Sequence, residues 1–357
     1  MRPLMLTSNA PFFAPSTTAV PSHPPFARTR KKSTRYRCTT PITARPGLNY
    51  RPSGLNDVGD VIGNLISPLR FEGATWTAEG VRRTAAGLIE PGLVSAREAM
   101  PYQAISSNGL VAGTVGHPLE NRRAWASHLG NFGETFWPES VSFTQGINRD
   151  GMVVGKTLFP AAPLLIYRAF VVDASKRPRF LTLPEGGMSD AIGVNDDGVV
   201  LVNVTALSQA SPRQKAWLWH DDVFIPLEAP PQCSTVATGF SPDGTVIGYR
   251  ENSFGQRQAV MWVDGHLVDL GVSPAENFIP HAINDHAVIV GSIRKTGGAT
   301  TAVRWTPRHG LERLADLTDS HYRGTLIDAV AINTSGHIAV VGQRGQTQEG
   351  FVLLPPD

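Results

Sequence analysis

The sequence predicts an all-β fold, a single β-propeller of seven blades with four antiparallel strands each. Two observations lead to this prediction. A short hairpin signature recurs seven times, and its turn positions are 42 to 50 residues apart, the repeat length of a propeller blade. Between the copies, apolar residues alternate with period two and show no helical periodicity.

Each copy of the signature reads as a tight turn between two strands. In the third copy an apolar strand end, Ile147, precedes Asn148, whose side chain can bond the backbone that follows. Gly151 then allows a positive φ, and a β-branched strand begins at Val153. The seven copies are Gly54–Gly63, Ala104–Gly113, Gly146–Gly155, Gly193–Val202, Gly239–Gly248, Ala282–Gly291 and Ala331–Gly342.

The third strand of each predicted blade begins at Ala or Gly and carries an aromatic residue. Every tryptophan except Trp137 falls in this element, and we expect these rings to fill the space between neighbouring sheets as core residues. The fourth strand is clearest at Leu267–Gly271 and Leu311–Leu314.

The seventh copy provides three strands, the last at Phe351–Leu354. An open array would leave unpaired sheet edges, so the missing outer strand must come from elsewhere in the chain. We expect Pro41–Arg45, just before the first hairpin, to pair with the last strand and close the ring. The predicted propeller therefore spans residues 41–357.

Residues 1–40 differ from the rest in composition. Residues 1–50 contain eight of the 32 Lys and Arg residues and no Asp or Glu, so the remainder has a net charge near −6. We expect a disordered basic leader. It could be an organelle transit peptide, a signal for a Sec-independent bacterial secretion route, a nucleic-acid or nuclear-import patch, or a solvated tail. The patch would use Arg28, Arg30, Lys31 and Lys32.

The repeated succession, Ala-x-x-Ile-Asn-x-x-Gly-x-Val-Val-Gly followed by Ala-Phe-x-Trp and x-Asp-Leu-Gly, resembles the HAF-type repeat of bacterial proteins often labelled probable extracellular repeat proteins. The resemblance covers about residues 50 to 355 and implies the propeller fold. It brings no catalytic constellation with it. Val202 replaces the second glycine in the fourth copy, Ala287 occupies the turn of the sixth, and no secretory signal is present.

Strand topology predicts two different faces. The tight turns and the third-to-fourth turns share one face, and the variable second-to-third loops and blade crossings share the other. Binding residues usually lie on variable loops held by a rigid frame. The candidate binding residues on that face are Arg70, Arg122, Arg123, Arg168, Arg213, Lys215, Arg257, Arg294, His281, His321, Tyr322 and Arg323. The cations among them favour an anionic partner, such as an acidic protein segment, a phosphorylated ligand or a nucleic acid.

No linear motif of catalysis or metal binding is present. Cys38 and Cys233 have no second Cys or His at ligand spacing, so we expect neither a metal nor a cofactor nor a disulfide framework. No apolar run is long enough for a transmembrane segment.

The sequence therefore favours a monomeric, non-enzymatic module that binds a protein partner. We expect secretion without a Sec signal and delivery into a host cell, with organelle targeting or a cytoplasmic location as alternatives. Two alternative functions stay open. One is a hydrolase or lyase with its site at the channel mouth, since propellers can assemble sites from distant residues. The other is a nucleic-acid or chromatin binder similar to the regulators of chromosome condensation, although their Gly-Gln-Leu-Gly signature is absent.

Overall fold

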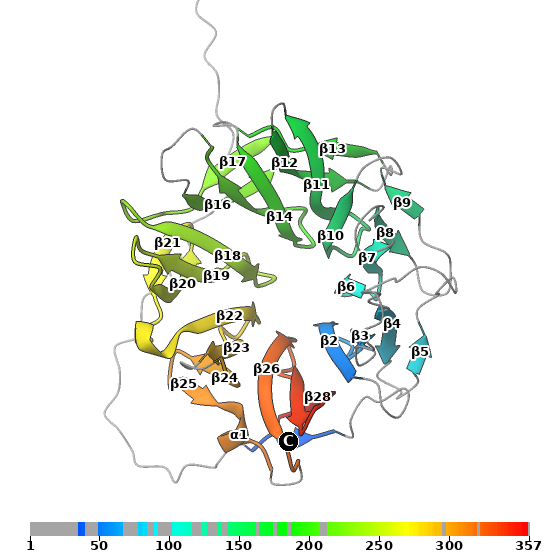
Figure 1. Cartoon of the computed structure of the whole chain (residues 1–357), viewed down its shortest axis with the longest axis vertical. Coiled ribbons are helices and arrows are strands. Elements are labelled where there is room, and N and C mark those ends of the chain that lie inside the picture. Colours follow the sequence, from blue (N-terminus) through cyan, green and yellow to red (C-terminus); the bar gives the residue numbers. More distant parts are fainter. Residues whose placement is uncertain are drawn as a thin grey trace, which may run out of the picture. The chain divides into compact units, whose positions relative to one another are not determined.

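The structure of the chain is a computed structural model. It describes residues 35–39, 49–66, 78–83, 89–91, 102–115, 123–127, 134–136, 141–161, 164–173, 177–183, 187–207, 213–294, 298–319 and 322–355. Within the unit Thr34–Asp357, the described elements form seven antiparallel sheets of four strands. Figure 1 shows these sheets in sequence order around a common centre. The all-β prediction is confirmed, because the helices in the described part are a 3-10 turn, Pro274–Glu276, and the four-residue α1, Leu314–Leu317.

The sheets are numbered here in sequence order, each with its strands from the centre outward. The first and second contain β2 (Asn49–Leu55), β3 (Val61–Ile66), β4 (Ala78–Arg83) and β5 (Ile89–Pro91), then β6 (Tyr102–Ile105), β7 (Val111–Val115), β8 (Arg123–Ser127) and β9 (Glu134–Phe136). The third and fourth contain β10 (Ser142–Ile147), β11 (Val153–Ala161), β12 (Leu164–Val172) and β13 (Pro178–Phe180), then β14 (Met188–Val194), β15 (Val200–Thr205), β16 (Gln214–His220) and β17 (Val223–Pro226).

The fifth and sixth sheets contain β18 (Ser234–Phe240), β19 (Val246–Glu251), β20 (Arg257–Val263) and β21 (His266–Asp269), then β22 (Phe278–Ile283), β23 (Ile289–Arg294), β24 (Thr300–Thr306) and β25 (Gly310–Arg313). The seventh contains β26 (Thr325–Ile332), β27 (Ile338–Arg344), β28 (Thr347–Leu354) and, as its outer strand, β1 (Arg37–Cys38). We call β2, β6, β10, β14, β18, β22 and β26 the inner strands, because they lie nearest the centre in Figure 1.

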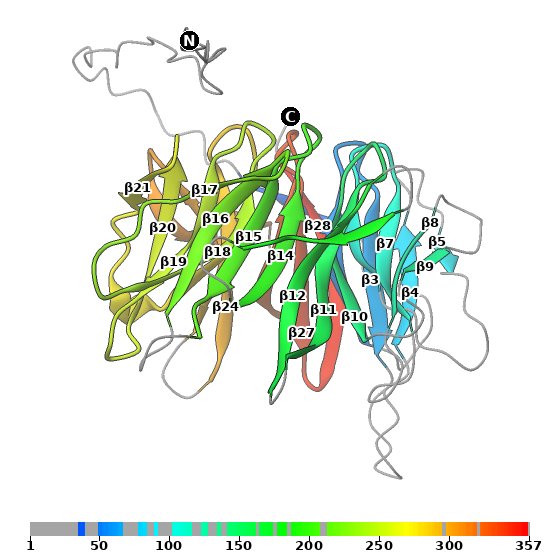
Figure 2. The ribbon, with the colours of Figure 1, turned by 90° about the horizontal axis from the view of Figure 1, so that it is seen from above.

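The strands run between two opposite faces (Figure 2). We call the face formed by the tight turns the turn face, and the opposite one, formed by the second-to-third loops and the crossings between sheets, the loop face. Each tight turn has its predicted residue in the left-handed region, with φ between 77° and 90° for the six glycines and φ 54° for Ala287. A residue with positive φ lets the chain reverse direction within so short a turn, and glycine adopts this conformation without strain.

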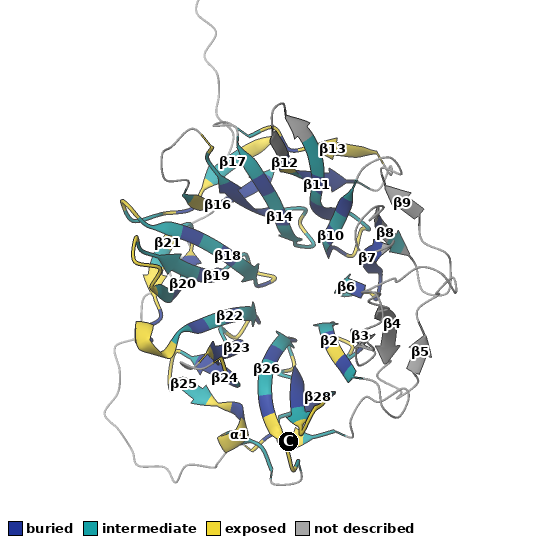
Figure 3. Cartoon of the chain, in the orientation of Figure 1, coloured by how far each residue is buried: buried dark blue, intermediate teal, exposed yellow. Residues whose placement is uncertain are grey.

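The core lies between the sheets, where the second and third strands are buried and the outer strands β13, β17 and β21 are largely exposed (Figure 3). Trp217, Trp219, Trp262 and Trp305 are all buried, which confirms the core assignment for these four third-strand residues. The indole nitrogen of Trp305 donates to the carbonyl of Leu270, just after the preceding sheet, at 3.0 Å. The indole nitrogen of Trp262 likewise donates to the Glu228 carbonyl at 2.7 Å, so these two rings fill inter-sheet space and satisfy their one polar atom.

The outer strand of the seventh sheet is not the expected segment. Arg37 and Cys38 of β1 pair with Leu354 and Leu353 of β28, so part of the predicted leader belongs to the folded unit. Tyr36 is buried, and its hydroxyl accepts a hydrogen bond from the Arg304 guanidinium at 3.1 Å. This buried aromatic anchor explains why pairing begins before residue 40. Pro41–Arg45 lie outside the described residues.

The thiol of Cys38 provides a measurement of this strand's docking. Burial, and secondarily the Asp319 carboxylate, raise its pKa to about 11. Because the thiolate is the nucleophile, we expect iodoacetamide to alkylate Cys38 of a Cys233→Ser variant about 100-fold more slowly at pH 8 than an ordinary thiol. Urea should restore the ordinary rate. An ordinary rate in the folded protein would mean that β1 does not dock on β28.

Candidate functional site

Every inner strand carries a β-bulge at the same place. The pairing register between the first and second strands shifts by one residue just before the turn-proximal Gly or Ala of each copy. The extra residues are Ser53, Gln103, Gln145, Ile192, Thr238, His281 and Val330, and we call them the bulge ring. A bulge turns a side chain away from the ordinary alternation of a strand. In all seven sheets the bulge lies at the same position along the inner strand.

The small residue after each bulge lets the inner strands converge. A Cβ added to Gly146 would lie 2.9 Å from the Cα of Gly193 in the next inner strand, and one added to Gly193 would lie 2.9 Å from the Phe240 ring. Side chains at these positions would push neighbouring sheets apart. The glycines therefore set the width of the space at the centre.

That space is a cavity of about 420 Å³ at the turn-face end of the inner strands. Its lining contains five bulge-ring residues, the apolar residues that follow the bulges, and the first residues of the tight turns. The bulge-ring members are Ser53, Gln103, Gln145, Ile192 and His281, and the apolar residues are Leu55, Ile105, Ile147, Val194, Phe240, Ile283 and Ile332. Among the described lining residues, the charged side chains are Asp57 and Asp196.

The bulge-ring hydroxyls bond the next sheet. Ser53 Oγ donates to the Tyr102 carbonyl at 2.7 Å, and Thr238 Oγ1 donates to the Pro280 carbonyl at 2.6 Å. Tyr102 and Pro280 both directly precede a bulge, so the two bonds are equivalent by position. Each hydroxyl proton is thereby used inside the protein.

Two longer bulge-ring side chains contact carboxylates. The Gln145 amide nitrogen donates to Asp190 Oδ1 at 3.3 Å, and Lys156 Nζ lies 2.6 Å from Asp190 Oδ2. His281 Nδ1 lies 3.1 Å from Asp328 Oδ1, whose second oxygen is 3.8 Å from Arg51. The His281 cluster therefore joins the sixth, seventh and first sheets.

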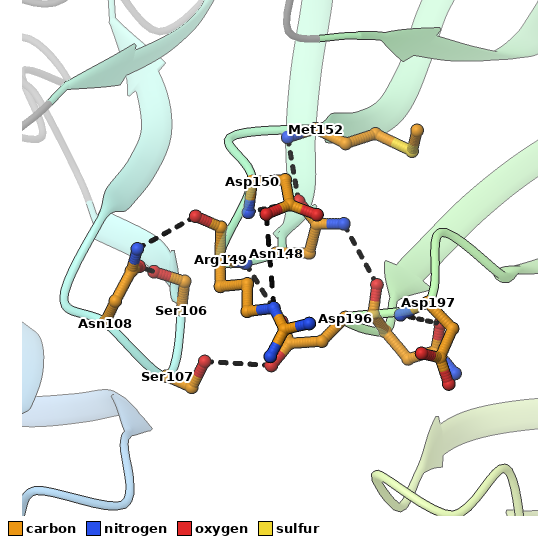
Figure 4. Close-up of polar contacts among 10 residues, drawn as sticks. Ser106, Ser107, Asn108, Asn148, Arg149, Asp150, Met152, Asp196 and Asp197 are labelled. Atoms are coloured by element: carbon orange, nitrogen blue, oxygen red, sulfur yellow. Dashed lines mark hydrogen bonds and ion pairs between the residues drawn. The ribbon is translucent and has the colours of Figure 1, made fainter.

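The tight turns bond one another around the cavity mouth (Figure 4). Asn148 Oδ1 accepts from its own turn, from the Met152 N–H at 2.8 Å, while its amide nitrogen donates to the Asn195 carbonyl at 3.0 Å. Asp196 accepts from the Arg149 N–H at 2.9 Å and from the Ser107 hydroxyl at 2.9 Å. The turn residues are thus held by neighbouring turns as well as by their own.

The same bonds join the last sheet to the first. Asn333 Nδ2 donates to the Asn56 carbonyl at 3.1 Å, and the Thr334 N–H donates to Asp57 Oδ1 at 3.0 Å. Asn333 in turn accepts, through its carbonyl, from Asn284 Nδ2 at 3.1 Å. The first and seventh sheets therefore lie side by side, although their residues are far apart in the sequence.

The predicted loop-face cations have different surroundings. Arg70, Arg122 and His321 lie outside the described residues, and for Arg123 only the backbone, in β8, is described. Arg168 stacks on Phe159, with its guanidinium carbon 4.1 Å from the ring centre. Arg257 forms an ion pair of 2.6 Å with Glu251, and this hydrogen bond raises the pKa of the guanidinium.

Four of the cations keep their charge available on the loop face. Lys215, Arg294 and Arg323 are exposed and Arg213 is half-buried, and no described acidic residue forms an ion pair with any of them. By contrast, Arg250 lies 3.4 Å from Asp269, and Arg344 lies 2.6 Å from Glu349. The positive field expected from every blade is therefore reduced by pairing in the fifth and seventh sheets.

Three further predicted site residues do not form one cluster. Tyr322 packs edge-on against Phe351, with ring centres 4.5 Å apart, and burial raises its pKa to about 12. It is part of the seventh sheet's packing. Arg323 follows it in the crossing before β26. His281 was expected on the variable face, but it lies in the bulge of β22 and lines the central cavity.

Sequence reasoning missed the bulge ring because strand alternation gives no sign of a register shift. The available signal is a residue of varying type directly before the small residue of each copy. Within the described part of the chain, no group of three His, Cys, Asp or Glu side chains could hold a metal ion. Nor does that part contain a helix long and apolar enough to cross a membrane.

Comparison with known proteins identifies the fold. No family model matches the chain, and no curated protein matches it. Among solved structures, the β-propeller domain of the Trilobed protease from Pyrococcus furiosus matches with a TM-score of 0.56 and 11% identity, over 86% of this chain and 95% of that one. YCF48, solved bound to a D1 peptide, matches with a TM-score of 0.53 and 11% identity, over 92% and 97%.

The acylaminoacyl peptidase of Pyrococcus horikoshii also matches, with a TM-score of 0.60 and 11% identity over 87% of this chain. The match covers 52% of the peptidase, so the chain spans about half of that enzyme's length. At this level of identity the likeness concerns the fold alone. The chain is an all-β protein whose structural neighbours are β-propellers.

Proposed function

We propose that the chain is a closed seven-bladed propeller that acts as a non-enzymatic module and binds an acidic segment of a protein partner on its loop face. Closure is supported by the pairing of β1 with β28 and by the bonds from Asn333 and Thr334 to the first tight turn. A ring closed by these contacts would be the rigid frame that a loop-borne binding surface requires.

The observation that carries the binding proposal is the exposure of Phe254 in the β19–β20 loop. The residue is 87% exposed, yet its backbone belongs to a hydrogen-bonded turn of this loop. Asn252 Oδ1 accepts from the N–H groups of Phe254 and Gln256, both at 3.0 Å, and Gly255 has φ 76°. A large aromatic ring presented to solvent in a fixed position is typical of an interface anchor.

The cations of the two sheets that flank the fifth favour a negatively charged partner. Lys215 and Arg213 belong to the β15–β16 region of the preceding sheet, and Arg294 ends β23 of the following one. Because no described acid neutralises these cations, they would attract carboxylates placed beside an apolar anchor residue.

A peptide-display selection on the full chain tests the proposal. We expect the enriched peptides to carry Asp or Glu next to an apolar residue, and their affinity to fall at least tenfold on Phe254→Ala, the order of effect of an aromatic anchor. Affinity should also fall with rising salt. The matched control is Val223→Ala, which removes an exposed apolar side chain, 58% accessible, from the outer strand β17.

Peptides without acidic enrichment, or binding unaffected by both Phe254→Ala and salt, would contradict this function. Membership of the HAF-type repeat proteins and delivery into a host cell remain predictions from the sequence. A fusion of residues 1–40 to a reporter in the source organism would test the delivery prediction.

A further inference from the structure

The hydrogen-bonding state of the bulge ring indicates what the central cavity can bind. Ser53, which lines the cavity, has already donated its hydroxyl proton to a backbone carbonyl of the next sheet. Its oxygen keeps lone pairs, which leaves this side chain as an acceptor.

Gln145 also leaves an acceptor atom free, and so does one tautomer of His281. A carboxylate can only accept hydrogen bonds, so the Gln145 group that bonds Asp190 must be its amide nitrogen, which donates. The amide oxygen of Gln145 is then the atom left to accept a hydrogen bond from a ligand. His281 Nδ1 lies 3.1 Å from Asp328 Oδ1, and in the tautomer that has its proton on Nδ1 the other ring nitrogen, Nε2, is an acceptor. Gln103 is the exception, because its oxygen accepts from Thr114 Oγ1 at 2.7 Å and its NH₂ group remains a donor.

The lining therefore has more acceptors than donors, and the charges around the cavity are also mainly negative. Asp57 and Asp196 line the mouth, and the described lining contains neither Lys nor Arg. Arg51 and Lys156 lie near Asp328 and Asp190, with which they form ion pairs. Arg149 lies in the third tight turn, half-exposed, and is 4.0 Å from Asp150.

From this excess of acceptors and negative charge, we propose that the central cavity binds a guanidinium or ammonium group, carried by an arginine or lysine side chain of a peptide. A guanidinium presents five N–H donors in one plane, which suits acceptors spread around a ring better than a single hydroxyl or amide does. Phe240 and Ile105 in the lining would contact the aliphatic stem, and the face of an aromatic ring attracts cations.

This site is separate from the loop-face surface around Phe254, since it opens at the turn face. The volume of about 420 Å³ lies within the range of small-ligand pockets. The cavity therefore has room for one long side chain together with adjoining backbone.

The test uses ligand-observed NMR titrations of the full chain with N-acetyl-arginine methylamide. Its matched control is the citrulline analogue, which has almost the same shape and no charge. We expect a dissociation constant on the order of 1 mM for the arginine compound and at least about tenfold weaker binding of citrulline. Spermidine, a neutral hexose and N-acetyl-glutamate methylamide complete the series.

The double variant Asp57→Asn with Asp196→Asn removes both charges and keeps an oxygen to accept from Thr334 and Arg149. It should weaken arginine binding roughly tenfold while the melting temperature stays close to that of the wild type. Phe254→Ala should leave arginine binding unchanged, so this proposal and the loop-face function can fail independently.

Equal affinity for the arginine and citrulline compounds, saturable binding of the hexose or the glutamate compound alone, or no saturable binding would overturn the proposal. Tighter binding of spermidine than of the arginine compound would retain a cation site but overturn its assignment to a peptide side chain. If the double variant unfolds, the comparison of ligands on the wild-type chain still decides.

Discussion

Replacement of Gly248 by Ala is expected to destabilise the protein by about 3 kcal/mol, the upper end of the cost of overpacking a core. Gly248 lies in β19 opposite Ala237, and an added Cβ would collide with the Val236 carbonyl oxygen and approach the Ala237 Cα to 2.9 Å. The obstacle is backbone, so a rotamer change cannot relieve it. Urea unfolding followed by tryptophan fluorescence measures the loss, since Trp262 lies in the adjacent strand.

Gly244→Ala is the matched control, because it changes the same hairpin without a steric collision. Gly244 has φ 88° and no atom within 4 Å of an added Cβ, so the cost is the left-handed strain alone, about 1 kcal/mol. Val202 occupies the position of Gly248 in the fourth sheet, opposite Ala191, which shows that a sheet can be built around a side chain here. Equal stability of Gly248→Ala and the wild type would mean that the fifth sheet makes the same adjustment.

Replacement of Asn333 by Ala is expected to destabilise the fold by about 2 to 3 kcal/mol. The side chain is buried and makes two bonds, one to the Asn56 carbonyl at 3.1 Å and one from the His337 N–H at 2.9 Å. Each intramolecular hydrogen bond contributes about 1 kcal/mol, and leaving buried partners unsatisfied costs more. The first of these bonds joins the seventh sheet to the first, so its loss weakens ring closure in particular.

Asn252→Ala is the control that separates the loss of the bond between sheets from the loss of the bonds within a turn. Asn252 accepts from two N–H groups of its own turn, as the tight-turn asparagines do, but its amide nitrogen donates to Gln256 within the same exposed loop. We expect a cost of about 1 kcal/mol or less. Asn333→Ala should also speed alkylation of Cys38, since β1 lies on the sheet that is loosened. Equal stability losses for the two variants, with Cys38 unchanged, would show that the inter-sheet bond contributes nothing.

The repeat and its turns could be predicted because they depend on neighbours in the chain. Gly151 takes a positive φ and Asn148 bonds the backbone two and four residues later, and both effects are encoded within a few positions. The third-strand tryptophans were predictable for the same reason, because alternation places them on a buried face. Within these limits the sequence alone was sufficient for the fold class and for the location of the hairpins.

The binding surfaces depended on contacts between distant segments. The pairing of Arg257 with Glu251 or of His281 with Asp328 follows from side-chain geometry and the approach of neighbouring sheets, so the availability of a charge could not be inferred from composition. The two-residue strand β1 has no pattern of its own and is held by the burial of Tyr36.

Local sequence therefore determined the units, their order and their turns, because backbone preferences and alternation act over a few residues. Only the tertiary structure decided which side chains face the central cavity, because the register shift in each inner strand and the convergence of the seven strands arise from packing between sheets.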